Sequence, residues 1–143
     1  MSMRRIGLAF VAGFLATLVF HQGGLALLQA AGLTDRTPFS MNATEPLGVP
    51  QVISLAFWGG VWGILLVALV KKRVPNGAFL LRALIFGAVL PTVVALLVVM
   101  PLKHLPVAGG GDPMLIAGGM ILNGLWGLGT ALFLLLFQRL VSR

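Results

Sequence analysis

The sequence has 143 residues, of which 59% are hydrophobic and only 9% charged, and its formal net charge is +7. With a mean hydropathy of +1.05, a water-soluble domain of this composition would expose large apolar patches, so the composition excludes a soluble globular protein and indicates a bilayer protein. The chain contains no cysteine. Disulfides, thiolate metal sites, iron–sulfur clusters and thiol catalysis are therefore excluded as well.

The first apolar stretch follows a short basic start and covers residues 6–28. It is longer than the apolar region of a signal peptide and no small-x-small cleavage pattern follows it, so we expect an uncleaved transmembrane helix. A span of the hydrocarbon core needs about 20 residues. His21 and Gln22 are therefore expected inside the outer part of the membrane, and Gly23-Gly24 permits a bend after them.

Three further apolar stretches complete an all-α, polytopic membrane protein with a single domain, residues 1–143. The expected helices are residues 6–28, 51–70, 78–100 and 114–137, and the expected exoplasmic loops are residues 34–50 and 101–113. Pro50 comes just before the second helix, in a position that proline tolerates. Pro91 lies near the middle of the third helix, where it removes one helical hydrogen bond and should kink the helix.

Charge is distributed unequally between the two sides of this topology. The side that holds both termini has only basic residues, namely Arg4, Arg5, Lys71, Lys72, Arg73, Arg82, Arg139 and Arg143. The other side has Arg36 and Lys103 with Asp35, Glu45 and Asp112. By the positive-inside rule, both termini face the cytoplasm of a bacterial inner membrane. The basic residues thus mark topology, and we expect no nucleic-acid partner.

Each half of the chain repeats one order of features. A basic residue precedes a helix, an outer loop follows, and a second helix begins after Pro50 or Pro113 and reaches Trp62-Gly63 or Trp126-Gly127 after twelve or thirteen residues. This order predicts two tandem two-helix hairpins related by a pseudo-twofold axis along the membrane normal. The alternative is that the two halves are unrelated hairpins.

Trp62 and Trp126 are the first candidates for a functional role. Twelve residues of helix span about 18 Å, which puts both indoles near the midplane, where they should face protein. Each ring is expected to pack over a glycine shelf, with its N–H donated to Asn123, Thr17, Thr92 or Ser54. The alternative is that both rings line a central cleft for a small apolar ligand, such as a quinone or a lipid tail.

Small residues at four-residue intervals indicate close helix packing. The residues in this pattern are Gly59 and Gly63 in the second helix, and Gly119, Asn123 and Gly127 in the fourth. Asn123 is strongly polar at mid-depth, so we interpret it as a hydrogen-bonding contact between helices or, alternatively, as a contact to a ligand or ion.

His21 is interpreted as a hydrogen-bonded packing residue or, alternatively, as a titratable group on a conduction path. A haem held by His21 and His104 is disfavoured because the two residues are expected at different depths. We predict no cofactor and no metal; a bound lipid or quinone is the alternative.

One stretch of the chain runs from Pro46-Leu47-Gly48-Val49-Pro50 to Phe57-Trp58-Gly59-Gly60-Val61-Trp62-Gly63. It resembles a stretch of small uncharacterised four-helix inner-membrane proteins of proteobacteria. The resemblance covers only this part of the chain. It implies no function, because that group has no assigned one.

These features favour a non-enzymatic accessory or interaction subunit that packs through its glycine-rich helix faces against itself or a larger membrane complex. The alternative is an oligomeric transporter, channel or binder of a small apolar ligand, with a path lined by Trp62, Trp126, Asn123, Thr92 and His21. Because the expected helices contain no acidic residue, antiport through an intramembrane carboxylate is disfavoured. Positioned acids, bases or metals that a reaction would need are not found in the sequence.

Overall fold

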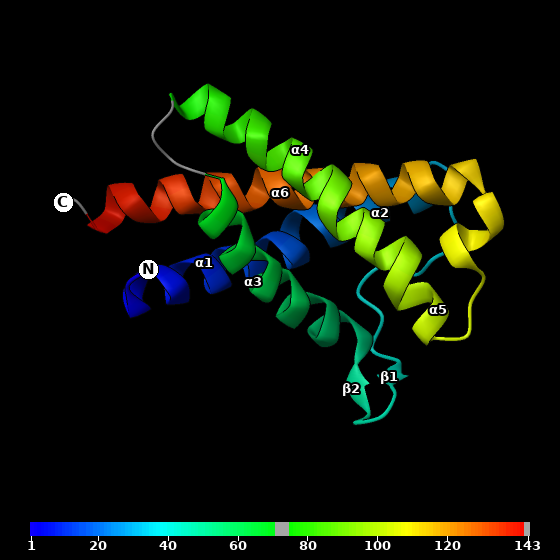
Figure 1. The fold of residues 1–143 in the computed structure, drawn as a ribbon. Helices are drawn as coiled ribbons and strands as arrows, with labels where there is room; N and C mark the ends of the chain where they lie inside the picture. Colours follow the sequence, from blue (N-terminus) through cyan, green and yellow to red (C-terminus); the bar gives the residue numbers. More distant parts are fainter. Residues whose placement is uncertain (71–74, 142–143) are drawn as a thin grey trace.

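The structure is a computed structural model that describes residues 1–70 and 75–141. In this part of the chain, four helical spans are long and apolar enough to cross a membrane: Met3–Ala30, Gln51–Leu69, Asn76–Leu102 and Pro113–Leu140 (Figure 1). The predicted all-α, polytopic architecture is confirmed. The basic run predicted to end the second helix, residues 71–73, and Arg143 lie outside the described residues.

The first span consists of α1 (Met3–Ala16), a π-helical turn η1 (Thr17–His21) and α2 (Gln22–Ala30). The irregular turn therefore comes before the glycine pair at which we expected a bend. A physical reason lies one turn earlier, where the Gly13 carbonyl accepts hydrogen bonds from the Thr17 amide and the Thr17 hydroxyl. A threonine that bonds back to the carbonyl of residue i−4 competes with the regular helical ladder.

The third span has a similar construction, with α4 (Asn76–Val94), a π-helical turn η2 (Ala95–Val99) and a short α5 (Met100–Leu102). Pro91 lies inside α4, and the irregular turn begins four residues after it rather than at it. The remaining two spans, α3 (Gln51–Leu69) and α6 (Pro113–Val141), are continuous α-helices.

The connection between α2 and α3 is an ordered loop that ends in a small hairpin. Strands β1 (Ala43–Thr44) and β2 (Val49–Pro50) pair antiparallel, with Thr44 opposite Val49. The Thr44 hydroxyl donates to the Val49 carbonyl at 2.7 Å. Carbonyls of the same loop, on Asn42 and Ser40, accept from the first two amides of α3, so the loop caps the helix that follows it. The connection before α6 contains a 3₁₀ segment, η3 (Val107–Gly111).

The helices form two hairpins, α1 with α3 and α4 with α6, and the hairpins meet mainly where α1 packs on α6 (Figure 1). A strict twofold relation between them would make α3 pack on α4 in the same way. In the structure α1 contacts α6 extensively, whereas α3 contacts α4 only slightly. The contact between the hairpins therefore departs from the predicted twofold symmetry, and one side of the bundle is left more open than the other.

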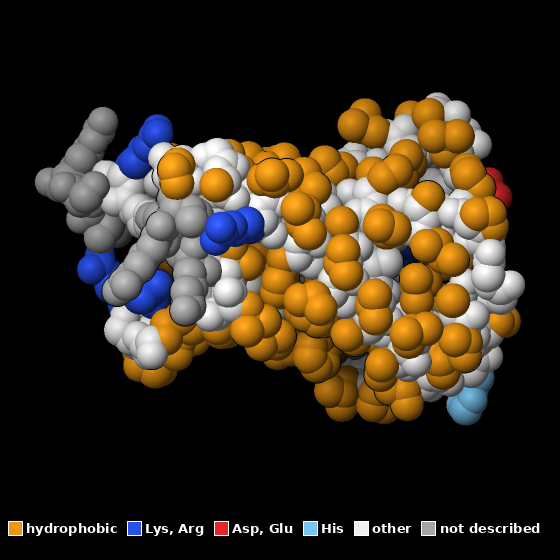
Figure 2. All heavy atoms as spheres, turned by 45° about the horizontal axis from the view of Figure 1, so that its top comes forward, with side chains coloured by type: hydrophobic (Ala, Val, Ile, Leu, Met, Phe, Trp, Pro, Cys, Tyr) orange, Lys and Arg blue, Asp and Glu red, His pale blue; other side chains and the backbone are white. Residues whose placement is uncertain are grey.

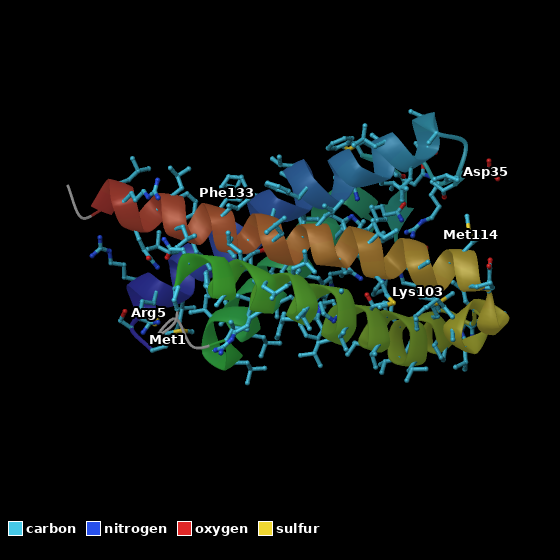
Figure 3. All side chains as sticks on the ribbon, turned by 90° about the horizontal axis from the view of Figure 1, so that it is seen from above. Met1, Arg5, Asp35, Lys103, Met114 and Phe133 are labelled. Atoms are coloured by element: carbon cyan, nitrogen blue, oxygen red, sulfur yellow. The ribbon has the colours of Figure 1, made fainter. Side chains whose placement is uncertain are left out.

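Charged side chains separate to the two ends of the bundle. On the face drawn in Figure 2, basic side chains gather at one end, an acidic side chain lies at the other, and apolar side chains cover the middle. Figure 3 places Met1 and Arg5 at the first end, and Asp35, Lys103 and Met114 at the opposite one. We call these the basic end and the acidic end.

Candidate functional site

The first hairpin is joined by backbone contact at its glycines. A Cβ atom on Gly13 of α1 would overlap the Gly59 carbonyl of α3 and lie 3.1 Å from the Gly63 Cα. A Cβ on Gly63 would lie 2.5 Å from the Ala9 carbonyl oxygen. Since only glycine allows two helix backbones to approach this closely, these residues set the distance between α1 and α3.

The second hairpin repeats the same contact. A Cβ on Gly87 of α4 would overlap the Asn123 carbonyl of α6, and one on Gly127 would overlap the Ala83 carbonyl. Ala83 and Gly87 thus correspond to Ala9 and Gly13, while Asn123 and Gly127 correspond to Gly59 and Gly63. The internal repeat seen in the sequence is matched by the packing inside each hairpin. Gly119, by contrast, makes an ordinary contact, since its Cβ would lie 3.4 Å from the Thr92 methyl carbon.

Trp126 joins the two hairpins. Its side chain is 3% exposed, and its Nε1–H donates to the Gly13 carbonyl of α1 at 3.0 Å. None of the four predicted side-chain acceptors is used. A backbone carbonyl takes that role, and the Thr17 hydroxyl donates to the same oxygen at 3.0 Å.

Trp62, the counterpart of Trp126 in the repeat, has a different environment. Its ring packs edge-on against Phe86 of α4, with the ring centroids 6.2 Å apart, and it is only partly buried. Its indole N–H makes no hydrogen bond within the described residues. Both tryptophans belong to one packed cluster, and neither lines either of the cavities described below.

Asn123 and Thr92 are brought together between α6 and α4. The Asn123 side-chain amide donates to the Thr92 hydroxyl at 3.0 Å, and that hydroxyl donates to the Gly119 carbonyl at 3.3 Å. These two hydrogen bonds therefore run from α6 to α4 and from α4 back to α6. The arrangement supports the interpretation of Asn123 as a polar contact between helices.

His21 is the last residue of η1, directly before α2. Its Nδ1 is 3.2 Å from the side-chain nitrogen of Gln22. Gln22 is 1% exposed, and its Oε1 accepts from the Phe39 backbone N–H at 2.7 Å. The buried amide of Gln22 thus fixes the loop after α2. Within the described residues, no three histidine or acidic side chains gather as a metal site.

The loop fixed by Gln22 forms one wall of a polar cavity of about 190 Å³ at the acidic end, which is open to the surface. Its walls come from α2, from the loop and from the start of α3, and the lining residues are Gln22, Leu25, Arg36, Thr37, Ser40, Asn42, Gln51 and Leu55. The sequence interpretation missed this site. A signal was available, because Gln22 and Gln51 are amides at the outer ends of two helices expected to form one hairpin.

A second, smaller cavity of about 100 Å³ lies at the basic end. It is mainly apolar, with Val70, Phe79, Leu134 and Phe137 among its lining, and Arg5 contributes its polar edge. The described part of the chain therefore has a polar cavity at one end, between the first hairpin and its loop, and an apolar one at the other.

Comparison with protein families, with curated proteins and with solved structures gave no match for this chain. The identity that the geometry supports is that of a multi-pass, all-α membrane protein built from two glycine-packed hairpins.

Proposed function

We propose that this chain is a non-enzymatic integral protein of the bacterial inner membrane that acts as an interaction subunit, by pairing with a second copy of itself through the open side of α3. Both termini are proposed to face the cytoplasm. The separation of basic and acidic side chains between the two ends of the bundle supports this orientation, because basic residues are retained on the cytoplasmic side.

The observation that carries the pairing proposal is the contrast between the two tryptophans. Trp126 donates its indole N–H to the Gly13 carbonyl, whereas the indole N–H of Trp62 has no acceptor within the described residues. Trp62 lies near the middle of α3, where lipid offers no hydrogen-bond acceptor. Leaving such a donor unsatisfied costs about 1–3 kcal/mol or more, and a carbonyl from outside the chain would remove that cost.

The surface around Trp62 is suited to a helix from another chain. Trp58, Leu65 and Leu69 lie on the same face of α3 at helical spacing, and they are 57%, 42% and 64% exposed. The glycine faces expected to bind a partner are instead used inside the chain, since Gly59, Gly63 and Gly127 are buried. The interaction surface proposed here is therefore aromatic and aliphatic rather than glycine-rich.

A second copy of this chain is the partner that we propose for this face of α3. Pro91 has no N–H, so it cannot donate to the Gly87 carbonyl as a helix residue normally would, and Gly87 itself is buried against α6. In the repeat, Gly87 corresponds to Gly13, the acceptor of Trp126. A twofold dimer formed through the exposed face of α3 would place the Trp62 indoles of both copies at one interface, as an isologous contact requires.

Resonance energy transfer in liposomes tests this proposal. Because the chain lacks cysteine, Leu140→Cys, at a 62% exposed position, gives a single dye site. We expect concentration-dependent transfer for this protein and a dimer dissociation constant raised about tenfold by Trp62→Phe, since two bonds of about 0.6 kcal/mol each are lost. Trp126→Phe is the matched control, whose bond lies inside one chain. Equal effects of the two variants, or no transfer above that of randomly mixed proteins, would overturn the proposal.

A further inference from the structure

The polar cavity at the acidic end is a binding site for a small anion, as we infer from the charge and the unused hydrogen-bonding groups of its lining. We propose that it takes an oxyanion, a carboxylate or a phosphate, that carries a short apolar part. The cavity lies at the first turns of α3, through Gln51 and Leu55, and the inference does not rest on pairing between copies.

The charge of the lining is positive. Among the described residues that line it, Arg36 is the only charged one and none is acidic. The Arg36 side chain is exposed at the mouth of the cavity, and within the described residues its guanidinium makes no ion pair and no hydrogen bond. A guanidinium presents a planar fork of donors that matches the two oxygens of a carboxylate or phosphate.

The start of α3 strengthens this preference. Gln51 is the first residue of α3 and lines the cavity, so the positive end of this helix lies at the cavity wall, although its first two amides already donate to the Asn42 and Ser40 carbonyls. The positive end of α3 and the Arg36 guanidinium therefore both attract an anion. Among the described lining residues, no acidic side chain opposes this attraction.

Several neutral donors also face the cavity. The side chains of Asn42, Gln51 and Thr37 line it and form no hydrogen bond within the described part of the chain; Thr37 and Asn42 are exposed and Gln51 is partly buried. Amides and hydroxyls of this kind donate hydrogen bonds to the oxygen atoms of an oxyanion that an arginine also binds. Leu25 and Leu55 supply the apolar part of the wall, which suits a ligand with a hydrocarbon portion.

The walls of the site are held in place before any ligand arrives. The Gln22 amide, which is 1% exposed, bonds the Phe39 N–H at 2.7 Å. The carbonyls of Asn42 and Ser40 accept from the Gln51 and Val52 amides at 2.9 and 3.0 Å. These bonds tie the loop that carries Arg36 to both α2 and α3. A ligand therefore meets a preorganised site, which lowers the entropy cost of binding.

Volume limits the size of the ligand. A water molecule in the liquid has a share of about 30 Å³, so the open cavity of about 190 Å³ takes up about six non-hydrogen atoms of a ligand. Butyrate is of that size and combines a carboxylate with an apolar tail. A whole phospholipid is far too large, but the phosphate of a lipid headgroup with its first carbons fits, and this oxyanion has the same chemistry as a free one.

Isothermal titration calorimetry on the full chain in phosphatidylcholine nanodiscs tests the site with three probes: butyrate, its neutral isostere butyramide, and inorganic phosphate. We expect saturable binding of butyrate or phosphate, with butyramide at least about tenfold weaker, because a hydrogen bond to a charged group exceeds a neutral one by that factor. Arg36→Gln should weaken binding of the anions about tenfold or more. Lys103→Gln is the matched control, since Lys103 is exposed at the same end and does not line the cavity.

A second set of nanodiscs distinguishes the two sources of the oxyanion. If phosphatidylglycerol in the bilayer competes with butyrate in the unmodified protein and not in Arg36→Gln, a lipid headgroup is the occupant; if it does not compete, a free anion is. Both outcomes support the site. The inference is overturned if neither butyrate nor phosphate binds saturably and phosphatidylglycerol produces no Arg36-dependent effect. Equal binding of butyrate and butyramide, or equal effects of Arg36→Gln and Lys103→Gln, would also overturn it.

Discussion

Substituting Gly127 by alanine probes the contact that sets the distance between α4 and α6. The added Cβ would overlap the Ala83 carbonyl and lie 3.2 Å from the Gly87 Cα. Both obstacles are backbone atoms of a packed helix, so neither can turn aside as a flexible side chain would. The two helices must move apart, and this affects the core around Trp126.

Two opposing terms determine the size of the effect. Forcing an extra methyl group into a packed site costs about 1–3 kcal/mol, whereas alanine is favoured over glycine inside a helix by about 1 kcal/mol. Gly118 lies in the same helix, and a Cβ added there would meet no atom of another residue within 4 Å, so Gly118→Ala carries only the second term. The difference between the two variants therefore isolates the clash, which we expect to be about 1–3 kcal/mol.

The assay is reversible unfolding in mixed micelles of increasing dodecyl sulfate fraction, followed by the fluorescence of the three tryptophans. We expect Gly127→Ala to unfold at a lower fraction than the unmodified chain, and Gly118→Ala at an equal or higher one. Gly63→Ala, the counterpart in the first hairpin, should resemble Gly127→Ala, because its Cβ would lie 2.5 Å from the Ala9 carbonyl oxygen. Equal stabilities of Gly127→Ala and Gly118→Ala would refute the argument from backbone contact.

Two further predictions concern polar contacts inside the bundle. Asn123→Ala removes the bond to the Thr92 hydroxyl and should lower the free energy of unfolding by about 0.6–1.7 kcal/mol, measured in the same micelle assay; no loss of stability would show that the bond contributes nothing. Gln22→Leu leaves the Phe39 amide without its acceptor, so hydrogen exchange at that amide should become at least about tenfold faster, and unchanged protection would mean that the loop is held by other contacts.

Much of the fold could be predicted from hydropathy and breaker residues alone. Pro50 and Pro113 mark the starts of α3 and α6 to within a residue, because a proline fits the first turn of a helix and not its interior. The irregular turns were less predictable. Pro91 is accommodated within α4, and the π-helical turn η1 follows Gly13, where a tertiary bond from Trp126 adds to the local one from Thr17.

The candidate site shows where prediction from one sequence stops. Glycine spacing predicted Gly59, Gly63 and Gly127 as packing residues, because small residues four positions apart lie on one face of a helix and let another helix approach closely. The acceptor of Trp126 could not be found in this way, because it is a backbone carbonyl that any residue could supply. The amides of Gln22 and Gln51 were a signal for a polar contact in the first hairpin, but the place of Arg36 in the same lining follows only from the path of the loop.

The measurement that tests the proposed function most directly is native mass spectrometry of the full chain released from its membrane in a mild detergent. We predict a dimer for the unmodified protein and for Trp58→Phe, whose indole N–H has no part in the proposed bond. Trp62→Phe should shift the population toward the monomer. A monomer for the unmodified protein, or a dimer population that Trp62→Phe leaves unchanged, would contradict pairing through α3.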